Sequence, residues 1–371
     1  MVNTLKITSI EIYKVDIELK EPFKIAIMEI ATAADVFIKI NTNEKEIYGW
    51  GEANPFWSIT GETQGINLAA AVDIAKLFIN KNPLSLEARI QEMESFLVHN
   101  TTIKSAFDMA LYDIYGKATG LPLYALLGGE KRSFWTDMTL GLGDPDETAH
   151  KAKELKDQGF QAIKVKLGTT YKMDVMRIEK IRSLIGDDWP IRVDANQGWD
   201  FKTALKVLKT IETMGIEYCE QPTPSWDYES LRKLRESLTV AIMADESLFS
   251  HHDALRLATL GCCDLFNIKL AKSGGIYNAL KINSIAEAAG IACMVGCMSE
   301  TRLGLTAAAH LVSARRNIKY ADLDGHLLLK EDPIIGGAQY NVGEIILPDT
   351  PGHGAEIDPT FLKKFECLTI K

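Results

Sequence analysis

Eight polar or reactive side chains recur at nearly constant spacing along the second part of the chain, each at the end of a short apolar run. They are Thr139, Lys164, Asp194, Glu220, Asp245, Lys269, Cys297 and Asp322. Neighbours in this series lie 24 to 30 residues apart, a distance that accommodates one strand, one helix and two short connections. Amphipathic helical segments, such as 174–185 and 204–214, separate the apolar runs. Repeated units of this kind predict a parallel sheet with helical crossovers.

Eight units of similar length favour a closed ring of strands, an α/β barrel, over an open sheet. An open doubly wound sheet would offer fewer strands and a glycine-rich phosphate turn, and the SGG at 273–275 is too short for that turn. After the eighth strand the chain has short strand-like pieces such as QYNVGEIILP instead of a regular helix. We therefore predict a (β/α)7β modified TIM barrel over residues 126–325, with the polar positions at its mouth.

The N-terminal part, residues 1–125, has strands first and helices afterwards, which predicts an α+β capping domain. The strand-like runs are 5–19, 35–41 and 46–50, and the helical patterns are 67–79, 84–98 and 103–119. The stretches 22–34 and 53–64 are loop-like, and we expect the regions near 20–34 and 53–64 to govern specificity. Gly and Pro at 120–130 indicate a linker. We expect residues 326–371 to return and complete the capping domain.

Charge and cysteine content restrict the partners and the compartment. The net charge is −9 and the pI about 5.4, whereas a nucleic-acid-binding protein needs a basic face. No apolar run approaches the ~20 residues that span a bilayer, and the N-terminus alternates like a strand instead of resembling a signal peptide. The six cysteines form no C-x-x-C pair, so we expect reduced thiols and no zinc site. We expect a cytoplasmic homo-oligomer that acts on a small molecule.

Three of the eight positions are acids on consecutive predicted strands. Asp194, Glu220 and Asp245 end the third, fourth and fifth strands. Because neighbouring strands lie about 5 Å apart, the carboxylates converge and repel one another unless a cation neutralises them. Oxygen ligands suit a hard ion, and Mg²⁺ leaves positions free for substrate oxygens. We predict one Mg²⁺ per subunit at these residues; three solvated acids at a loop rim are the alternative.

Three lysines lie on two further strands of the predicted ring. Lys164 and Lys166 flank Val165 on the second strand, so alternation points both to the same side. Lys269 ends the sixth strand. Strands two and six are opposite in a ring of eight, and a substrate held between them would meet one lysine on each face. Two-base epimerisation requires this arrangement. A solvated basic edge is the alternative, but the flanking residues are apolar.

The chemistry of a carbon acid fits these parts. The carbon beside a carboxylate is very weakly acidic, and Mg²⁺ stabilises the resulting enolate as a Lewis acid. A lysine becomes a base when its pKa falls from ~10.4 toward neutrality, and nearby cations favour that fall. We interpret the seven histidines, including His251, His252 and His326, as surface residues outside the chemistry. The pattern thus predicts proton transfer with Lys166 and Lys269 as the bases.

The motifs IKVKLG, VDANQGW, CEQP, MADES and NIKLAKSGG occur in this order, and in this order they resemble the muconate-lactonizing-enzyme subgroup of the enolase superfamily. The resemblance covers the whole chain. It implies a Mg²⁺-dependent isomerase with lysine bases, in which Lys164 supports the enolate. By the same resemblance, Thr139 and the Cys297, Met298, Ser299 turn would line the substrate.

The motif YADLDGH places two acids, Asp322 and Asp324, at the end of the eighth strand. An acidic pair across the barrel from a bound carboxylate suits an ammonium group, such as the free amino terminus of a dipeptide; loop acids at the barrel edge are the alternative. The motif is similar to that of the dipeptide epimerases, the group that includes L-Ala-D/L-Glu epimerase. That resemblance implies epimerisation at the α-carbon of the C-terminal residue and suggests a role with peptidoglycan-derived peptides.

Lys24 lies where glutamate-preferring relatives carry arginine, and lysine would pair less well with a side-chain carboxylate. We therefore expect an Ala-X epimerase of broad tolerance with small or apolar X. A strict L-Ala-D/L-Glu epimerase remains an alternative, as do N-acylamino acid racemase, o-succinylbenzoate synthase and cycloisomerase activities. A non-catalytic metal-binding barrel is a further alternative.

Overall fold

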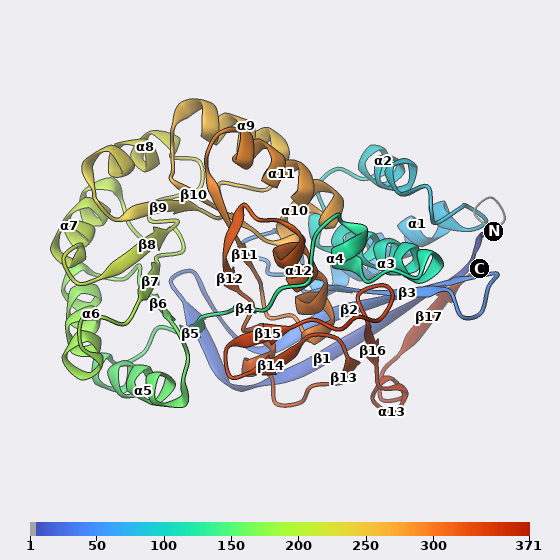
Figure 1. Cartoon of the computed structure of the whole chain (residues 1–371), viewed down its shortest axis with the longest axis horizontal. Helices are drawn as coiled ribbons and strands as arrows, with labels where there is room; N and C mark the ends of the chain where they lie inside the picture. The colour runs from blue at the N-terminus through green and yellow to red at the C-terminus, as the bar shows by residue number, and fades with distance from the viewer. Residues whose placement is uncertain (1–4) are drawn as a thin grey trace.

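A computed structural model describes residues 5–371, and its centre is a parallel sheet of eight strands (Figure 1). The strands run in sequence order around the sheet: β5 (Met138–Leu140), β6 (Ile163–Lys166), β7 (Ile191–Asp194), β8 (Ile216–Glu220), β9 (Ala241–Ala244), β10 (Leu265–Ile268), β11 (Ala292–Gly296) and β12 (Ile318–Asp322). A parallel bridge between Thr136 and Ala321 joins the last strand to the segment before the first. The sheet therefore closes into the predicted barrel.

Helices follow seven of the eight strands and cover the outside of the barrel (Figure 1). They are α5 (Pro145–Gln158), α6 (Tyr171–Ile185), α7 (Phe201–Ile211), α8 (Tyr228–Ser237), α9 (His251–Leu260), α10 (Leu270–Ser273) with α11 (Ile276–Ala288), and α12 (Arg302–Ala314). Side-chain oxygens of the N-cap residues cap six of them, at Asp144, Thr170, Asp200, Asp227, Ser250 and Thr301. A 3₁₀ turn, Gly325–Leu328, takes the place of a crossover helix directly after β12, which confirms the (β/α)7β arrangement.

The N-terminal domain packs three helices on an antiparallel sheet. Its strands are β1 (Ile7–Ile25), β2 (Met28–Thr42) and β3 (Tyr48–Ala53), and its helices are α1 (Gln64–Phe78), α2 (Leu86–Phe96) and α3 (Thr101–Thr119). A β-carbon at Gly49 or Gly51 would lie 1.9 or 1.8 Å from a backbone oxygen of α3. Only glycine therefore allows β3 and α3 to approach this closely.

The segment after the barrel returns to both domains. It contains β13 (Ile334–Gly336), β14 (Gln339–Asn341), β15 (Glu344–Ile346), β16 (Ala355–Ile357), α13 (Pro359–Leu362) and β17 (Cys367–Ile370). β15 pairs with β4 (Phe134–Trp135) before the barrel. β17 pairs antiparallel with β1, and Ile10 lies opposite Ile370. The N-terminal sheet is therefore completed from the far end of the chain (Figure 1).

Two segments predicted to be irregular have regular structure. Residues 22–34 belong to the hairpin of β1 and β2, whose tip pairs Ile25 with Met28. A register shift between Glu18 and Phe23 interrupts the alternation of inward and outward residues. Because this alternation is the sequence signal of a strand, residues 22–34 resemble a loop. The linker at 120–130 contains a short helix, α4 (Leu123–Leu126). Residues 54–63 form turns without a strand or helix.

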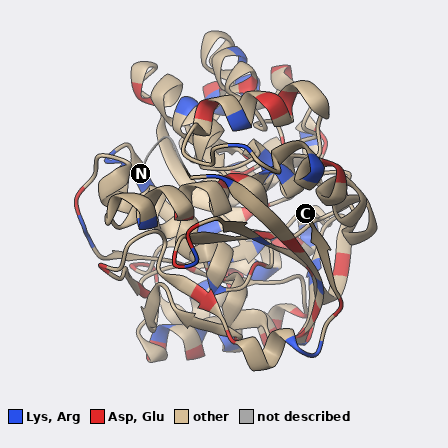
Figure 2. Ribbon diagram, turned by 90° about the vertical axis from the view of Figure 1, so that its right-hand side faces the viewer, with Lys and Arg blue, Asp and Glu red and all other residues tan. Residues whose placement is uncertain are grey.

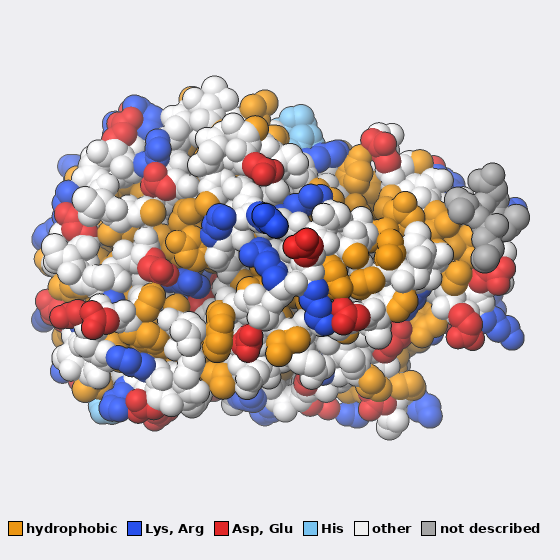
Figure 3. Space-filling view, viewed as in Figure 1, with side chains coloured by type: hydrophobic (Ala, Val, Ile, Leu, Met, Phe, Trp, Pro, Cys, Tyr) orange, Lys and Arg blue, Asp and Glu red, His pale blue; other side chains and the backbone are white. Residues whose placement is uncertain are grey.

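The outside of the molecule carries charges of both signs. Figure 2 shows acidic and basic residues interspersed over the helices around the barrel, and Figure 3 shows the same mixture among apolar side chains on another face. Among the described residues, no helix combines the length and the apolar character that crossing a bilayer requires.

Three histidines are buried, in contrast to the surface positions expected for all of them: His310, His326 and His353. The backbone N–H of Tyr124 donates to His310 Nδ1 (3.0 Å), so Nε2 carries the proton and donates to the carbonyl of His353 (3.1 Å). His310 thus joins α4, α12 and the returning segment. Burial lowers the pKa of His310 to about 3, and the side chain is neutral in the folded protein.

His310 gives the fold a measurable sensitivity to acid. Because its folded pKa is about 3 and its unfolded pKa about 6.5, the unfolded chain binds the proton first, and stability is lost as pH falls from 6.5 toward 3. We expect the free energy of unfolding to fall by about 2 kcal/mol more in the wild type than in His310→Gln between pH 7 and 5. Urea titrations measure the difference. His150→Gln, at an exposed histidine, is the control; equal pH slopes in wild type and His310→Gln would refute the assignment.

Candidate active site

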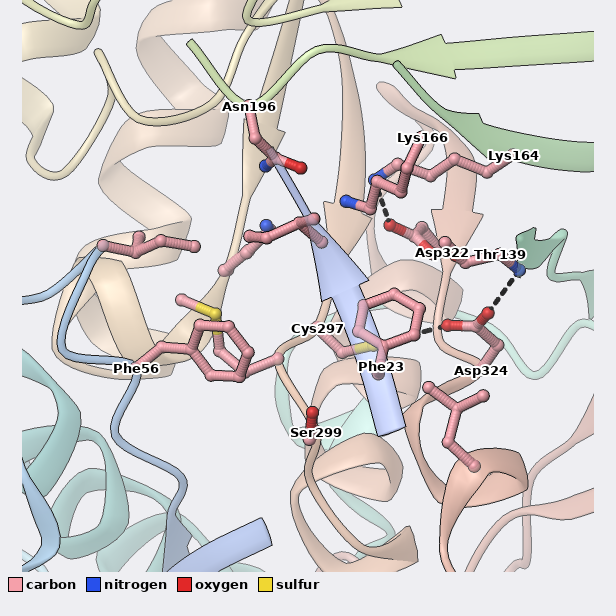
Figure 4. Close-up of a pocket in the computed structure, with 15 residues that line it drawn as sticks. Phe23, Phe56, Thr139, Lys164, Lys166, Asn196, Cys297, Ser299, Asp322 and Asp324 are labelled. Atoms are coloured by element: carbon pink, nitrogen blue, oxygen red, sulfur yellow. Dashed lines mark hydrogen bonds and ion pairs between the residues drawn. The ribbon is translucent and has the colours of Figure 1, made fainter. Parts of the chain in front are cut away.

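A cavity opens at the mouth of the barrel, under the tip of the β1–β2 hairpin (Figure 4). Nine residues singled out from the sequence line it: Thr139, Lys164, Lys166, Lys269, Cys297, Met298, Ser299, Asp322 and Asp324. They come from β5, β6, β10, β11 and β12 and the turns after these strands. Their convergence follows from the barrel, because the carboxyl ends of all eight strands meet at one face.

Lys166 and Lys269 reach this cavity from strands on opposite sides of the ring. Three strands, β7, β8 and β9, separate β6 from β10. Lys166 Nζ lies 2.6 Å from an oxygen of Asp194, and Lys269 Nζ lies 2.8 Å from an oxygen of Asp245. Each ammonium group is therefore held by a different carboxylate, and a small molecule in the cavity would lie between them.

Asp194, Glu220 and Asp245 are fully buried behind the lysines. Lys164 Nζ lies 3.1 Å from Asp194 and 2.8 Å from Glu220, so it bridges two of the acids. Burial and the neighbouring Asp194 raise the pKa of Glu220 to about 8. Burial also raises the pKa of Asp194, but Lys166 and Lys164 outweigh it, and the pKa lies below its ordinary value. The three acids thus behave as one electrostatic unit.

The pKa of Lys269 depends on the same acids. Burial lowers the pKa of the ammonium group, but Asp245 and Glu220 outweigh burial and raise it above its ordinary value. Lys164 lowers this pKa, as expected of a nearby cation, but the two acids outweigh it. A cation held by Asp245 and Glu220 would weaken their attraction for Lys269 and favour the neutral base.

The surroundings of the acids fit a hard cation. Asn196 Oδ1 and Glu246 Oε2 are buried beside them and accept no hydrogen bond from the residues that the structure describes. Asn196 donates to the other oxygen of Glu246 (3.1 Å), and its backbone N–H donates to Asp194 (2.8 Å). Its backbone is in the left-handed region, with φ at 40°, which turns the chain at the end of β7. Buried oxygens and carboxylates are ligands that suit Mg²⁺.

Asp322 and Asp324 form an acidic wall of the cavity at the end of β12 (Figure 4). Lys164 Nζ lies 2.7 Å from Asp322. Asp324 accepts a hydrogen bond from the backbone N–H of Thr139 (2.6 Å) and lies 3.8 Å from the Cys297 sulfur. Burial and the charge of Asp322 raise the pKa of Asp324 to about 6. At neutral pH both carboxylates are therefore ionised, and Lys164 balances one of the two charges.

The apolar residues of the cavity lie mostly within the regions near 20–34 and 53–64 that were expected to govern specificity, and Leu328 lies outside both. Apolar side chains of the N-terminal domain and of the turn after β12 cover the mouth: Phe23, Ile25, Phe56, Ile59 and Leu328. Alternation along β1 could have indicated Phe23 and Ile25. Lys272 was not found from the sequence; it is fully buried, and its ammonium group contacts both a side-chain oxygen and the backbone oxygen of Asp245.

The structure does not place Lys24 in this cavity. Lys24 lies between Phe23 and Ile25 on β1, and successive side chains of a strand point to opposite faces. Its neighbours line the cavity, so Lys24 is exposed on the other face and lines a separate cleft.

Residues of the N-terminal domain hold the turn that carries Met298 and Ser299. Asn54 Oδ1 accepts the backbone N–H of Ser299 (3.0 Å). Glu52 accepts the backbone N–H groups of Thr301 (2.7 Å) and Gly304 (2.8 Å) at the start of α12. The N-terminal domain therefore covers the cavity and also positions one of its walls.

Comparison with known families and proteins gives a consistent assignment. Residues 7–128 match the mandelate racemase/muconate lactonizing enzyme N-terminal domain, and residues 147–361 match the enolase C-terminal domain-like family. The chain is 40% identical over 353 residues to an L-Ala-D/L-Glu epimerase of Clostridium acetobutylicum, covering 94% of this chain and 98% of that protein. It is 42% identical over 338 residues to a hydrophobic dipeptide epimerase of Enterococcus faecalis, covering 90% and 94%.

The fold agrees with a solved structure over nearly its whole length. A dipeptide epimerase from Cytophaga hutchinsonii, crystallised with Mg and the dipeptide D-Ala-L-Val, superimposes with a TM-score of 0.97 at 40% identity. The match covers 99% of this chain and all of that one. This chain therefore belongs to the enolase superfamily, and relatives that it resembles at about 40% identity across both domains are dipeptide epimerases.

Proposed function

We propose that this protein is a Mg²⁺-dependent isomerase that epimerises dipeptides at the α-carbon of the C-terminal residue. One observation carries the proposal: Lys166 and Lys269 enter one cavity from opposite strands, with three buried acids behind them and an acidic pair at the end of β12. The similarity to dipeptide epimerases, including one crystallised with Mg and a dipeptide, supports it.

Asp194, Glu220 and Asp245 would hold one Mg²⁺ per subunit. When bound, the ion supplies Lewis-acid stabilisation of negative charge on the substrate carboxylate. Lys164, which bridges Asp194 and Glu220 at 3.1 and 2.8 Å, adds a fixed positive charge on the same side. Preorganised charge of this kind stabilises the carbanion that forms when the adjacent α-carbon loses its proton.

The two lysines then move protons at the α-carbon. One lysine, as the neutral amine, takes the α-proton from its face and becomes an ammonium group. The other, as an ammonium group, returns a proton to the opposite face and becomes neutral. The configuration is inverted, and the proton inventory of the enzyme and substrate is unchanged. The reverse reaction exchanges the roles of Lys166 and Lys269.

Asp322 and Asp324 would bind the ammonium group of the N-terminal residue. The pair ends β12, which lies opposite β8, the strand of Glu220, in the ring of eight strands. A dipeptide would therefore extend from the ion at its carboxylate to the acidic pair at its ammonium group. Substrates of N-acylamino acid racemases and cycloisomerases have no free ammonium group and would leave these two charges uncompensated.

The apolar mouth supports a small or apolar C-terminal residue. Phe23, Ile25, Phe56 and Ile59 line it, and Lys24, the cation expected to pair with a glutamate side chain, lies outside the cavity. The hairpin tip and the 53–64 segment would therefore select the substrate by apolar contact. Ala-Glu epimerisation is less well supported by these residues.

Incubation with Mg²⁺ and a dipeptide library in D₂O tests the function. We expect deuterium at the α-carbon of the C-terminal residue, with small and apolar members fastest, as measured by mass spectrometry. If no member incorporates deuterium at that carbon, the proposed function is wrong.

The acidic pair makes a separate prediction about the amino end. We expect the wild type to prefer L-Ala-L-Ala over its N-acetyl form by at least about 100-fold in kcat/KM, the scale of a buried charge left unpaired. Asp324→Asn should lower kcat/KM for the free dipeptide about tenfold or more and leave the acetylated form unchanged. Because the pKa of Asp324 is about 6, KM for the dipeptide should rise as pH falls below 6. Equal losses for both substrates would contradict the assignment.

The compartment, the oligomeric state and the biological role of the protein are also part of the proposal. We propose a cytoplasmic homo-oligomer that handles peptidoglycan-derived peptides. The six cysteines are free and five of them are buried or half-buried, as in a reducing compartment.

A further inference from the structure

A second cleft adjoins the catalytic cavity. It lies between the end of β1, the strand β5 with the loop after it, and one face of α5. Phe23, Thr139 and Leu328 line both spaces, so these three side chains form the boundary between the cavity and the cleft.

The acidic pair lies at this boundary. Asp324 accepts the backbone N–H of Thr139 at 2.6 Å, and Thr139 Oγ1 lies 3.4 Å from Asp322. An ammonium group bound by the pair would therefore lie beside Thr139. In an N-terminal residue the side chain and the ammonium group are attached to the same carbon, so the side chain starts at the same boundary. A short side chain remains there, whereas a long one needs the space of the cleft.

The interior of the cleft is apolar. Besides the boundary residues, it is lined by Met138, Leu140, Leu142, Leu155 and Leu327. All of these except Leu140 are half-buried, so a guest side chain would remove further apolar surface from water.

The charges of the cleft are balanced and lie at its rim. Lys20, Lys24 and Lys151 face Glu21, Glu147 and Glu154, and all six are exposed. Lys151 pairs with Glu21 at 2.6 Å, and Lys20 donates to the carbonyl of Leu327 at 2.8 Å. With equal numbers of each sign the rim does not select a charged guest, and the interior favours an apolar one.

The cleft is held open by backbone contacts. The N–H of Leu142 donates to the carbonyl of Lys24 at 2.9 Å, which ties the loop after β5 to the β1–β2 hairpin. A β-carbon at Gly141 would lie 3.2 Å from that carbonyl and 3.5 Å from the Phe23 ring. The absence of a side chain at Gly141 leaves room for the ring of Phe23, one of the three residues at the boundary between the two spaces.

We propose that this cleft is the subsite for the side chain of the N-terminal residue, and that it accepts long apolar side chains such as those of leucine, methionine and phenylalanine. The proposal rests on the proposed function and extends it, since the substrates are then not restricted to those that begin with alanine. It also gives Lys24 a place beside the first residue of the dipeptide instead of the second.

The experiment compares L-Ala-L-Ala, L-Leu-L-Ala, L-Met-L-Ala and L-Phe-L-Ala with Mg²⁺ in D₂O, following α-proton exchange at the C-terminal residue by NMR. We expect kcat/KM of the three long substrates to equal or exceed that of L-Ala-L-Ala. Leu142→Trp, which fills the cleft without lining the cavity, should raise KM for the long substrates at least tenfold and change L-Ala-L-Ala less than twofold. Leu155→Trp on α5 provides a second variant, and Leu255→Trp, at an exposed leucine of α9, is the matched control.

The outcomes separate the two proposals. Turnover of L-Ala-L-Ala without turnover of the long substrates overturns the cleft assignment and leaves the proposed function standing. Equal effects of the cleft variants on all four substrates, or no effect on any, also overturn the assignment. Absence of exchange with every dipeptide overturns the proposed function and the subsite with it. A cleft variant that keeps L-Ala-L-Ala activity is folded, so its selective loss of the long substrates supports the subsite.

Discussion

Lys166→Ala and Lys269→Ala should each lower epimerisation by about 1000-fold or more, because each removes one of two groups that must act on opposite faces of the same carbon. The two variants should differ from each other in one respect. Each should still exchange the α-proton of one enantiomer in D₂O, through the lysine that remains, and the two variants should retain opposite enantiomers. Separate incubations with the L,L and L,D dipeptides, followed by NMR, measure this.

We expect neither substitution to destabilise the fold, so a loss of activity reports the loss of the base itself. Asp194 keeps Lys164 at 3.1 Å when Lys166 is removed, and Asp245 keeps its contact with Lys272 when Lys269 is removed. Neither acid is left as an unpaired buried charge. Lys172→Ala, at an exposed lysine at the start of α6, is the control. Normal exchange of both enantiomers in both variants would show that the bases have been misassigned.

Removal of the metal should abolish activity and preserve the fold. After chelation with EDTA we expect at least a 1000-fold loss of epimerisation, restored by Mg²⁺, with an unchanged circular dichroism spectrum. The fold should persist because lysine ammonium groups neutralise the three acids without the ion. Added Mg²⁺ should also raise the melting temperature, since a ligand at 100 times its Kd stabilises the folded state by about 2.7 kcal/mol.

Two variants distinguish Mg²⁺ binding at the buried acids from the general effect of removing one negative charge. Glu220→Gln should lose activity and also lose the Mg²⁺-dependent rise in melting temperature. Glu229→Gln, at an exposed acid of α8, should keep both. Unchanged activity in the chelated wild type, or unfolding on chelation, would contradict the proposed role of Asp194, Glu220 and Asp245.

The barrel and the convergence of its polar residues were predictable because the length of a strand–helix unit is nearly fixed. Once eight such units are recognised, the carboxyl ends of the strands must meet at one face. That rule was enough to bring Lys166, Lys269 and Asp322 to one cavity. It uses only the position of each residue at the end of its strand.

The remaining features depend on local backbone geometry that such spacing does not contain. The direction of Lys24 is set by the register of β1 after its shift between Glu18 and Phe23. Asn196 reaches the buried acids through a left-handed turn, with φ at 40°, and Lys272 does so through the short helix after β10. The burial of His310 depends on contacts with two segments distant in sequence. Each needs the tertiary structure to be known first.

The pairing of β17 with β1 has a consequence for biosynthesis. Ile10 and Ile370 are partners across one edge of the N-terminal sheet, so that edge of β1 stays open while the whole barrel emerges from the ribosome. An open strand edge is a site where nascent chains associate wrongly. The N-terminal domain, which covers the cavity, can therefore complete its sheet only after the barrel has been synthesised. The catalytic residues are thus translated before the sheet of the domain above them is complete.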